Sequence, residues 1–240
     1  MGVEYQHYLI PRPNSFAPSA VQIGGLIHQL IADNWLWVPE TAISGEVTQR
    51  VPRERGGPER RPIPLPITIN WLIEQLTRDQ FLLLEWNARN IVNLGIKYPF
   101  LTIPVAAEEV YYSLALHWSG DYIYHTSEII EPFDETRCRC GTDLGFDAQN
   151  DVFYESRLRS ACPSCGRPFD PSDLTAVSRH PWTGEPLPPV AGGATYRFAV
   201  VLDCGKCIPE CDGNITLDPA FKESCEMAVS CPLYEVGDFS

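Results

Sequence analysis

The fold of this protein is decided first at its N-terminal end, by the stretch EYQHYLIPRPNSFAPSAVQIGGLIHQLI, residues 4–31. Residues 4–10 are rich in tyrosine and aliphatic side chains, which predicts a β-strand. Pro11, Pro13 and Pro18 mark a loop, and Ser19 can cap a helix by accepting a hydrogen bond from a first-turn amide. The apolar residues that follow recur with helical spacing and predict an amphipathic helix: Ile23, Leu26, Ile27, Leu30 and Ile31.

The C-terminal end repeats this order of strand, loop and helix. Residues 196–202 form the strongest predicted strand of the chain. Asp218 followed by Pro219 is typical of a helix start, with an aspartate cap and a proline at the first helical position. One face of this helix would carry Phe221, Ser224, Cys225 and Ala228, and residues 233–236 would close the chain as a short strand.

Between the two ends, further strands and one helix are predicted. Residues 81–86 form a buried strand, and Asn70 caps a short helix that continues to Thr77. Residues 110–118 and 122–130 are two strands joined by a hairpin turn at Ser119-Gly120-Asp121. This mixture predicts an α+β fold, with a mixed or largely antiparallel sheet and helices packed on one of its faces.

Two cysteine pairs interrupt this pattern between residues 131 and 175. Cys138 and Cys140 precede Gly141, and 21 residues separate Cys140 from Cys162. Cys162 and Cys165 enclose a short turn that is followed by Gly166. Four thiolates presented by two such turns form a closed tetrahedral site for a borderline-soft ion. We therefore expect one structural zinc site, with Cys138, Cys140, Cys162 and Cys165 as its ligands.

The second of these pairs resembles the zinc knuckle of zinc-ribbon proteins. The first pair departs from that pattern, because one residue instead of two separates Cys138 from Cys140. The resemblance covers only about residues 131–175, and it implies a small zinc-ribbon module held together by its metal. We expect this module to be inserted into a main α+β domain formed by residues 1–130 and 176–240.

The remaining five cysteines leave three interpretations open. A thiol pair at Cys204 and Cys207 is compatible with redox chemistry, but no amphipathic helix follows it to lower a thiolate pKa. A second zinc site is the next interpretation, although the spacing is irregular. The third and favoured interpretation is a group of reduced, buried thiols that pack like small apolar side chains. The residues concerned are Cys204, Cys207, Cys211, Cys225 and Cys231.

No catalytic motif is visible, so the sequence predicts no catalytic or cofactor-binding residues. It contains no G-x-S-x-G, no glycine-rich phosphate loop and no H-E-x-x-H. Isolated histidines are more often structural than catalytic. The histidines are His7, His28, His117, His125 and His180.

Charge limits the choice of partner. The formal net charge is −13, which disfavours nucleic acid and favours a basic protein partner. Residues 131–175 carry nine acidic residues and five arginines, so the zinc module itself is acidic. Residues 200–240 carry eight acidic residues and two lysines. Five arginines and two glutamates between Arg50 and Arg61 make that segment basic, and we expect an exposed loop there.

These observations lead to one functional hypothesis and two alternatives. The hypothesis is a non-enzymatic, zinc-stabilised, acidic protein that binds a basic partner, in the manner of an inhibitor or immunity protein. The first alternative is a zinc-ribbon protein associated with nucleic acid through residues 50–61, and the second is a hydrolase with an unrecognised site. No secretory signal or membrane-length apolar run is visible, so we expect a soluble, cytoplasmic protein.

Overall fold

The computed structural model describes residues 4–37, 47–51, 59–78, 81–88, 95–101, 112–125, 140, 142, 147–152, 155–158, 161–168, 175–176, 190–191, 195–206 and 217–239. The strands span Glu4–Pro11 (β1), Val47–Val51 (β2), Glu59–Pro62 (β3), Phe81–Ala88 (β4), Tyr112–His125 (β5), Asp147–Val152 (β6), Glu155–Leu158 (β7), Thr175–Ala176 (β8), Val190–Ala191 (β9), Thr195–Lys206 (β10) and Leu233–Phe239 (β11). The helices span Ala20–Ala32 (α1), Ile69–Arg78 (α2) and Pro219–Val229 (α4).

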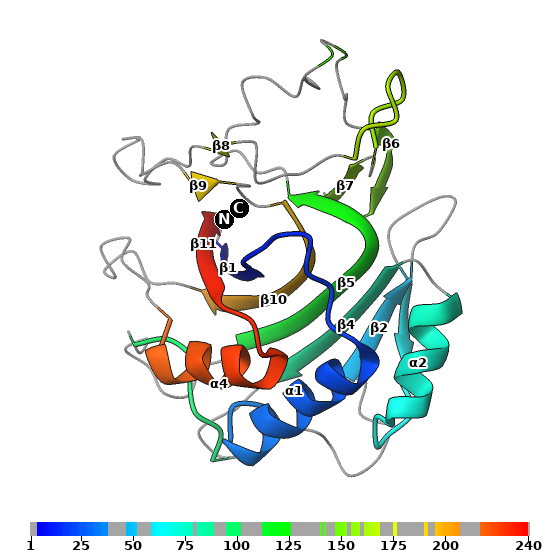
Figure 1. The fold of residues 1–240 in the computed structure, drawn as a ribbon. Coiled ribbons are helices and arrows are strands. Elements are labelled where there is room, and N and C mark those ends of the chain that lie inside the picture. The colour runs from blue at the N-terminus through cyan, green and yellow to red at the C-terminus, as the bar shows by residue number, and fades with distance from the viewer. Residues whose placement is uncertain are drawn as a thin grey trace.

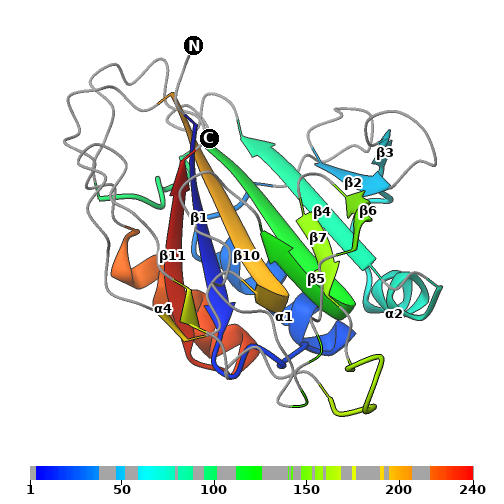
Figure 2. The same ribbon diagram turned by 90° about the horizontal axis from the view of Figure 1, so that it is seen from above.

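One nine-stranded sheet organises the molecule. Its order is β11-β1-β10-β5-β4-β2-β3, with β7 also pairing with β5 and β6 pairing with β7. All of these described pairs are antiparallel, as is the separate pair of β8 and β9. The sheet is curved, and α1, α2 and α4 lie together on its outer face (Figures 1 and 2). The predicted α+β class, antiparallel sheet and one-sided helices are therefore confirmed.

The two ends of the chain pair at one edge of this sheet, where β11 is the outermost strand. Strand β1 lies between β10 and β11, so the first strand pairs with the last two strands of the chain. Strand β10 lies between β1 and β5 and is antiparallel to both. In chain order, β1, α1, β5, β10, α4 and β11 follow the β-α-β-β-α-β pattern of a split βαβ unit. Elements β2, β3, α2 and β4 are inserted after α1, and β6 to β9 are inserted between β5 and β10.

The predicted caps of α1 and α4 are present. The Ser19 hydroxyl accepts a hydrogen bond from the Gln22 amide at 3.3 Å, and the Gln22 side chain accepts one from the Ser19 amide at 3.0 Å. Asp218 accepts a hydrogen bond from the Ala220 amide at 2.8 Å. The predicted start of α2 at Asn70 is wrong, because the helix begins at Ile69 and the Thr68 hydroxyl accepts the 3.2 Å hydrogen bond from the Trp71 amide.

The main core lies between the sheet and the helices. Alternate side chains of the central strands point toward the helices, as the two-residue period of a strand requires. Fully buried members include Leu114 of β5, Val200 of β10, Leu26 of α1 and Phe221 of α4, each at 0% exposure. At about 25 cal/mol per Å² of buried apolar surface, this layer is the principal source of stability.

The hairpin predicted at residues 119–121 is wrong, because β5 continues through it. Phe198 of β10 faces Trp118, whereas Tyr196 faces Ile123, so three extra residues of β5 bulge between these two pairs. The Arg197 guanidinium donates a 2.7 Å hydrogen bond to the Gly120 carbonyl inside the bulge. Residues that favour a turn when taken alone are thus part of a strand here, because β5 pairs with neighbouring strands on both sides.

The described ends of the basic segment 50–61 are strands and not the predicted loop. Residues 59–61 and Arg50 belong to β3 and β2, which pair at the edge of the sheet, and only residues 52–58 lie outside the described residues. Within the predicted zinc module, Leu158 of β7 pairs with Tyr122 of β5, so the segment contributes a strand to the main sheet. The division of the chain into a main domain and a module inserted at residues 131–175 stays a prediction.

Candidate metal centre

The turn at residues 162–166 is built to present sulfur atoms. A bridge between Ala161 and Pro168 closes its base. The Cys162 amide donates to the Arg167 carbonyl at 2.8 Å, and the Gly166 amide donates back to the Cys162 carbonyl at 2.9 Å. Gly166 has a φ angle of +66°, a conformation that glycine adopts without strain. The glycine that follows Cys165 is therefore explained by the backbone of the turn.

Three of the four predicted ligands come together here. The sulfur atoms of Cys140, Cys162 and Cys165 all lie within 4.8 Å of one another and could hold a metal ion. The Cys140 and Cys162 sulfurs are 3.6 Å apart. Cys162 is buried, whereas the other two are exposed. The fourth predicted ligand, Cys138, lies outside the described residues.

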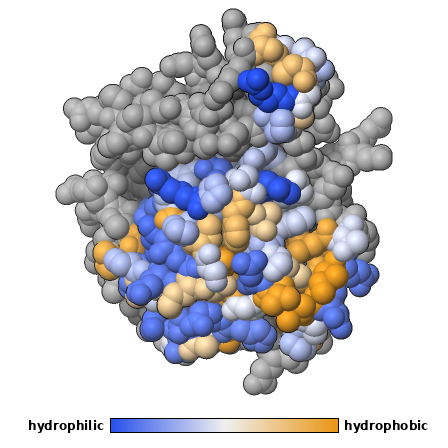
Figure 3. All heavy atoms as spheres, in the orientation of Figure 1, coloured by the Kyte–Doolittle hydropathy of each residue, from blue (hydrophilic) through white to orange (hydrophobic). Residues whose placement is uncertain are grey.

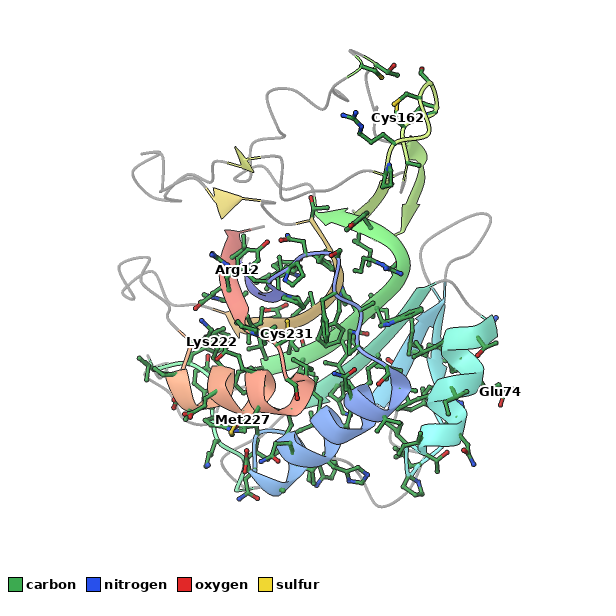
Figure 4. All side chains as sticks on the ribbon, in the orientation of Figure 1. Arg12, Glu74, Cys162, Lys222, Met227 and Cys231 are labelled. Carbon is green, nitrogen blue, oxygen red and sulfur yellow. The ribbon has the colours of Figure 1, made fainter. Side chains whose placement is uncertain are left out.

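The turn favours the thiolate form of Cys162. The backbone amides of Cys165 and, to a smaller extent, Ser164 donate hydrogen bonds to its sulfur and hold its pKa below the ordinary value, partly offset by burial. The Cys140 thiol contacts the Thr142 hydroxyl at 3.2 Å. Figure 4 shows Cys162 in the loop beyond β7, on the side of the sheet away from α1, α2 and α4. Thiolates held close together in this way bind soft and borderline metal ions.

The described members of the second cysteine group lie in the core. Cys225 is fully buried on α4, and burial raises its thiol pKa. Cys231 is buried as well, its pKa is raised mainly by burial, and its thiol donates to the Arg12 carbonyl at 3.5 Å. Both residues therefore behave as reduced, packed thiols. The side chain of Cys204 and the whole of Cys207 and Cys211 lie outside the described residues.

Two of the histidines take part in structural contacts. His7 is buried and its Nδ1 lies 2.6 Å from the Glu235 carboxylate. His117 is buried on the inner face of the sheet, with its Nδ1 2.9 Å from the Tyr196 hydroxyl. His28 is exposed on α1. The side chain of His125 and all of His180 lie outside the described residues.

The His117 contact belongs to a network that sequence reasoning missed. The Tyr8 ring packs against Tyr196 at 6.1 Å and against His117 at 6.5 Å, and its hydroxyl donates to the Gln6 side chain at 2.8 Å. The four residues come from β1, β5 and β10 and join these strands on the face opposite the helices. No short sequence pattern predicts this, because the three strands are far apart in the sequence and the pairing of β10 with β5 shifts register next to Tyr196.

Comparison with known proteins adds nothing to this description. No protein-family model matches the chain, and no match is found among curated proteins or solved structures. No helix among the described residues is long and apolar enough to cross a membrane.

Proposed function

We propose that this protein is a non-enzymatic binding protein that holds one structural zinc ion and engages a basic protein partner. The observation that carries the proposal is the net charge of −13, which opposes association with phosphate backbones and favours encounter with cations. An inhibitor or immunity-type protein, which occludes a toxin, is the narrower form of this function.

The cysteine geometry supports zinc as the metal. Thiolates that bind zinc tetrahedrally at about 2.3 Å lie about 3.8 Å from one another. The observed distance of 3.6 Å between the Cys140 and Cys162 sulfurs is close to that value. With Cys138 as the fourth ligand, the site would be closed to water, so it would stabilise the segment and supply no catalytic position.

Zinc content tests the first half of the proposal. We expect one zinc per chain in protein never exposed to a chelator, and we expect Cys165→Ser to lower both zinc content and thermal stability. Cys225→Ser is the matched control, since its thiol is buried in the core away from the site and its loss should destabilise the protein without releasing zinc. Less than about half an equivalent of zinc in the wild type contradicts the assignment.

The partner can be sought among the products of neighbouring genes, since an immunity protein is encoded beside its toxin. We expect one basic product to form a one-to-one complex in calorimetry, with an association rate that falls as salt is added. If no neighbouring product binds the folded, zinc-loaded protein, the immunity-type function is rejected.

A role on nucleic acid is the second candidate, and one observation favours it. Arg50 and Arg60 are direct cross-strand partners in the β2–β3 pair, and Arg61 lies next to them. Arginines concentrated along one sheet edge in this way are the charge pattern that a phosphate backbone attracts. Measuring the affinity of the same zinc-loaded protein for DNA and RNA decides between the two candidates. Tight binding favours the role on nucleic acid, and weak binding favours the basic protein partner.

A further inference from the structure

An apolar surface lies open to solvent where α1 and α2 meet. Val21 of α1 is 60% exposed, and Ile69 and Ile73 of α2 are 41% and 49% exposed. With the exposed Gly25 these residues form what we term the α1–α2 face. Figure 3 shows a hydrophobic patch over the beginning of α1 and over α2, next to more hydrophilic surface at α4. Contiguous apolar surface of this kind marks interaction sites.

The two glycines of α1 differ in whether contacts within the protein account for a glycine at that position. A Cβ atom on Gly24 would lie 3.2 Å from Cγ1 of Ile69, so this glycine lets α2 approach α1 closely. A Cβ atom on Gly25 would meet nothing within 4 Å. A glycine inside a helix costs about 1 kcal/mol relative to alanine, and the packing described here gives no compensation at Gly25. Close approach of another molecule to Gly25 would offset this cost.

The charge distribution around this face points to the class of partner. Helix α1 contains no Asp, Glu, Lys or Arg, although the chain is 20% charged. Charged residues are depleted at the cores of interfaces and return at the rims. Helix α2, which contributes two residues to this face, also carries the exposed Glu74, which points away from the molecule in Figure 4.

Helix α4 also packs against α1 and is net acidic. Its Ser224 donates a 2.8 Å hydrogen bond to Asp33 at the C-terminal end of α1, where Lys97 also interacts electrostatically with the Asp33 carboxylate. Helix α4 adds the exposed Glu223, while its lysine, Lys222, lies 3.9 Å from Glu226. Exposed carboxylates therefore lie on both helices that pack against α1.

We infer that the α1–α2 face is the contact core for a protein partner that presents apolar side chains flanked by lysine or arginine. This inference rests on the proposed function and adds where on the protein the partner binds. A second copy of the chain fits poorly, because each copy carries a charge of −13 and would bring its acidic rim against another.

The test uses a synthetic amphipathic helix of leucine and lysine, with a leucine and glutamate peptide of the same pattern as control. We expect the first peptide to shift the amide resonances of Val21, Gly25 and Ile73. Val21→Glu combined with Ile73→Glu should weaken binding at least about tenfold, as loss of central apolar contacts does. Met227 of α4 is also 60% exposed, and Met227→Glu should change the affinity for the peptide by less than about twofold.

Each other result overturns the inference. Equal loss in Met227→Glu, equal binding of the glutamate peptide, or shifts confined to α4 and β11 would each show that the α1–α2 face is not the site for a basic partner. A wild-type dimer that the double variant converts to monomer would show that the face binds a second copy. Shifts confined to α4 contradict the inference and leave the proposed function standing. If neither the peptide nor any neighbouring gene product binds, the inference and the proposed function are both rejected.

Discussion

Asp33 shows how a single residue can join two helices that lie far apart in the sequence. It follows the last turn of α1, where its carboxylate accepts a 2.9 Å hydrogen bond from Gln29 and a 2.8 Å hydrogen bond from Ser224 of α4. The Gln29 bond first, and the Ser224 bond second, lower the pKa of Asp33. Because the folded-state pKa is below the unfolded one, this stabilisation is present above the ordinary carboxyl pKa of about 3.9 and is lost as pH falls through the folded value.

Ser224→Ala should therefore lower the free energy of unfolding by about 1 kcal/mol at pH 7. The difference from wild type should shrink as pH falls through the lowered folded-state pKa of Asp33, below which the carboxyl group is protonated in both states. Chemical denaturation over a series of pH values from neutral downward measures this. Thr77→Ala is the control, since its hydroxyl donates to the Ile73 carbonyl at 2.7 Å and touches no carboxylate. A Ser224 effect that stays constant as pH falls, for as long as the protein remains folded, contradicts the assignment to Asp33.

Helix α1 allows a prediction at the scale of one element. Gly25→Ala should raise the free energy of unfolding by about 0.5–1 kcal/mol, because the new methyl group meets no neighbour within 4 Å while the unfolded chain loses freedom. Thermal unfolding measures the gain. Gly24→Ala is the matched variant, and its smaller gain or net loss should reflect the 3.2 Å approach to Ile69.

A larger gain in the free energy of unfolding for Gly24→Ala than for Gly25→Ala would show that the packing of α1 on α2 is not as described. If Gly25→Ala stabilises the protein and also weakens binding of the leucine and lysine peptide, the glycine is retained for the interface at the expense of stability.

At the scale of the whole molecule, the charge predicts weak binding to nucleic acid. With a net charge of −13, affinity for duplex or single-stranded nucleic acid should be no better than about high micromolar at physiological salt. Fluorescence anisotropy at two salt concentrations measures it. Tight, steeply salt-dependent binding that disappears on neutralising Arg53, Arg55, Arg60 and Arg61 would instead support the nucleic-acid function.

The acidic C-terminal region should contribute the rim of the partner interface. Glu223 and Glu226 lie on α4 beside α1, while Glu210 and Asp212 lie outside the described residues. Neutralising all four should slow association with the basic partner, and the loss should diminish at high salt because electrostatic steering is screened.

Stopped-flow association at two ionic strengths measures this effect. Neutralising four acids of the cysteine segment, namely Asp134, Glu135, Asp143 and Asp151, is the control with the same change in net charge. An unchanged rate at low salt in the folded C-terminal variant removes this region from the interface.

Much of the local structure follows from the sequence by itself. The capped starts of α1 and α4, the strands β1, β4, β10 and β11, and the turn between Cys162 and Cys165 depend on residues within a few positions of one another. Caps, two-residue or helical periodicity and a glycine with positive φ are all local features, which is why short patterns predict them. The same locality explains the error at residues 119–121, where the local turn signal gave way to pairing with β10.

The tertiary structure decided which distant residues meet. It placed β1 between β10 and β11, brought Cys140 to Cys162, joined His117 to Tyr196 through a register shift, and set Ile69 against Gly24. These contacts join residues 22 or more positions apart, the shortest being the approach of Cys140 to Cys162. Each depends on burying the apolar faces of the central strands and helices together, and a single sequence does not encode which faces meet in any short pattern.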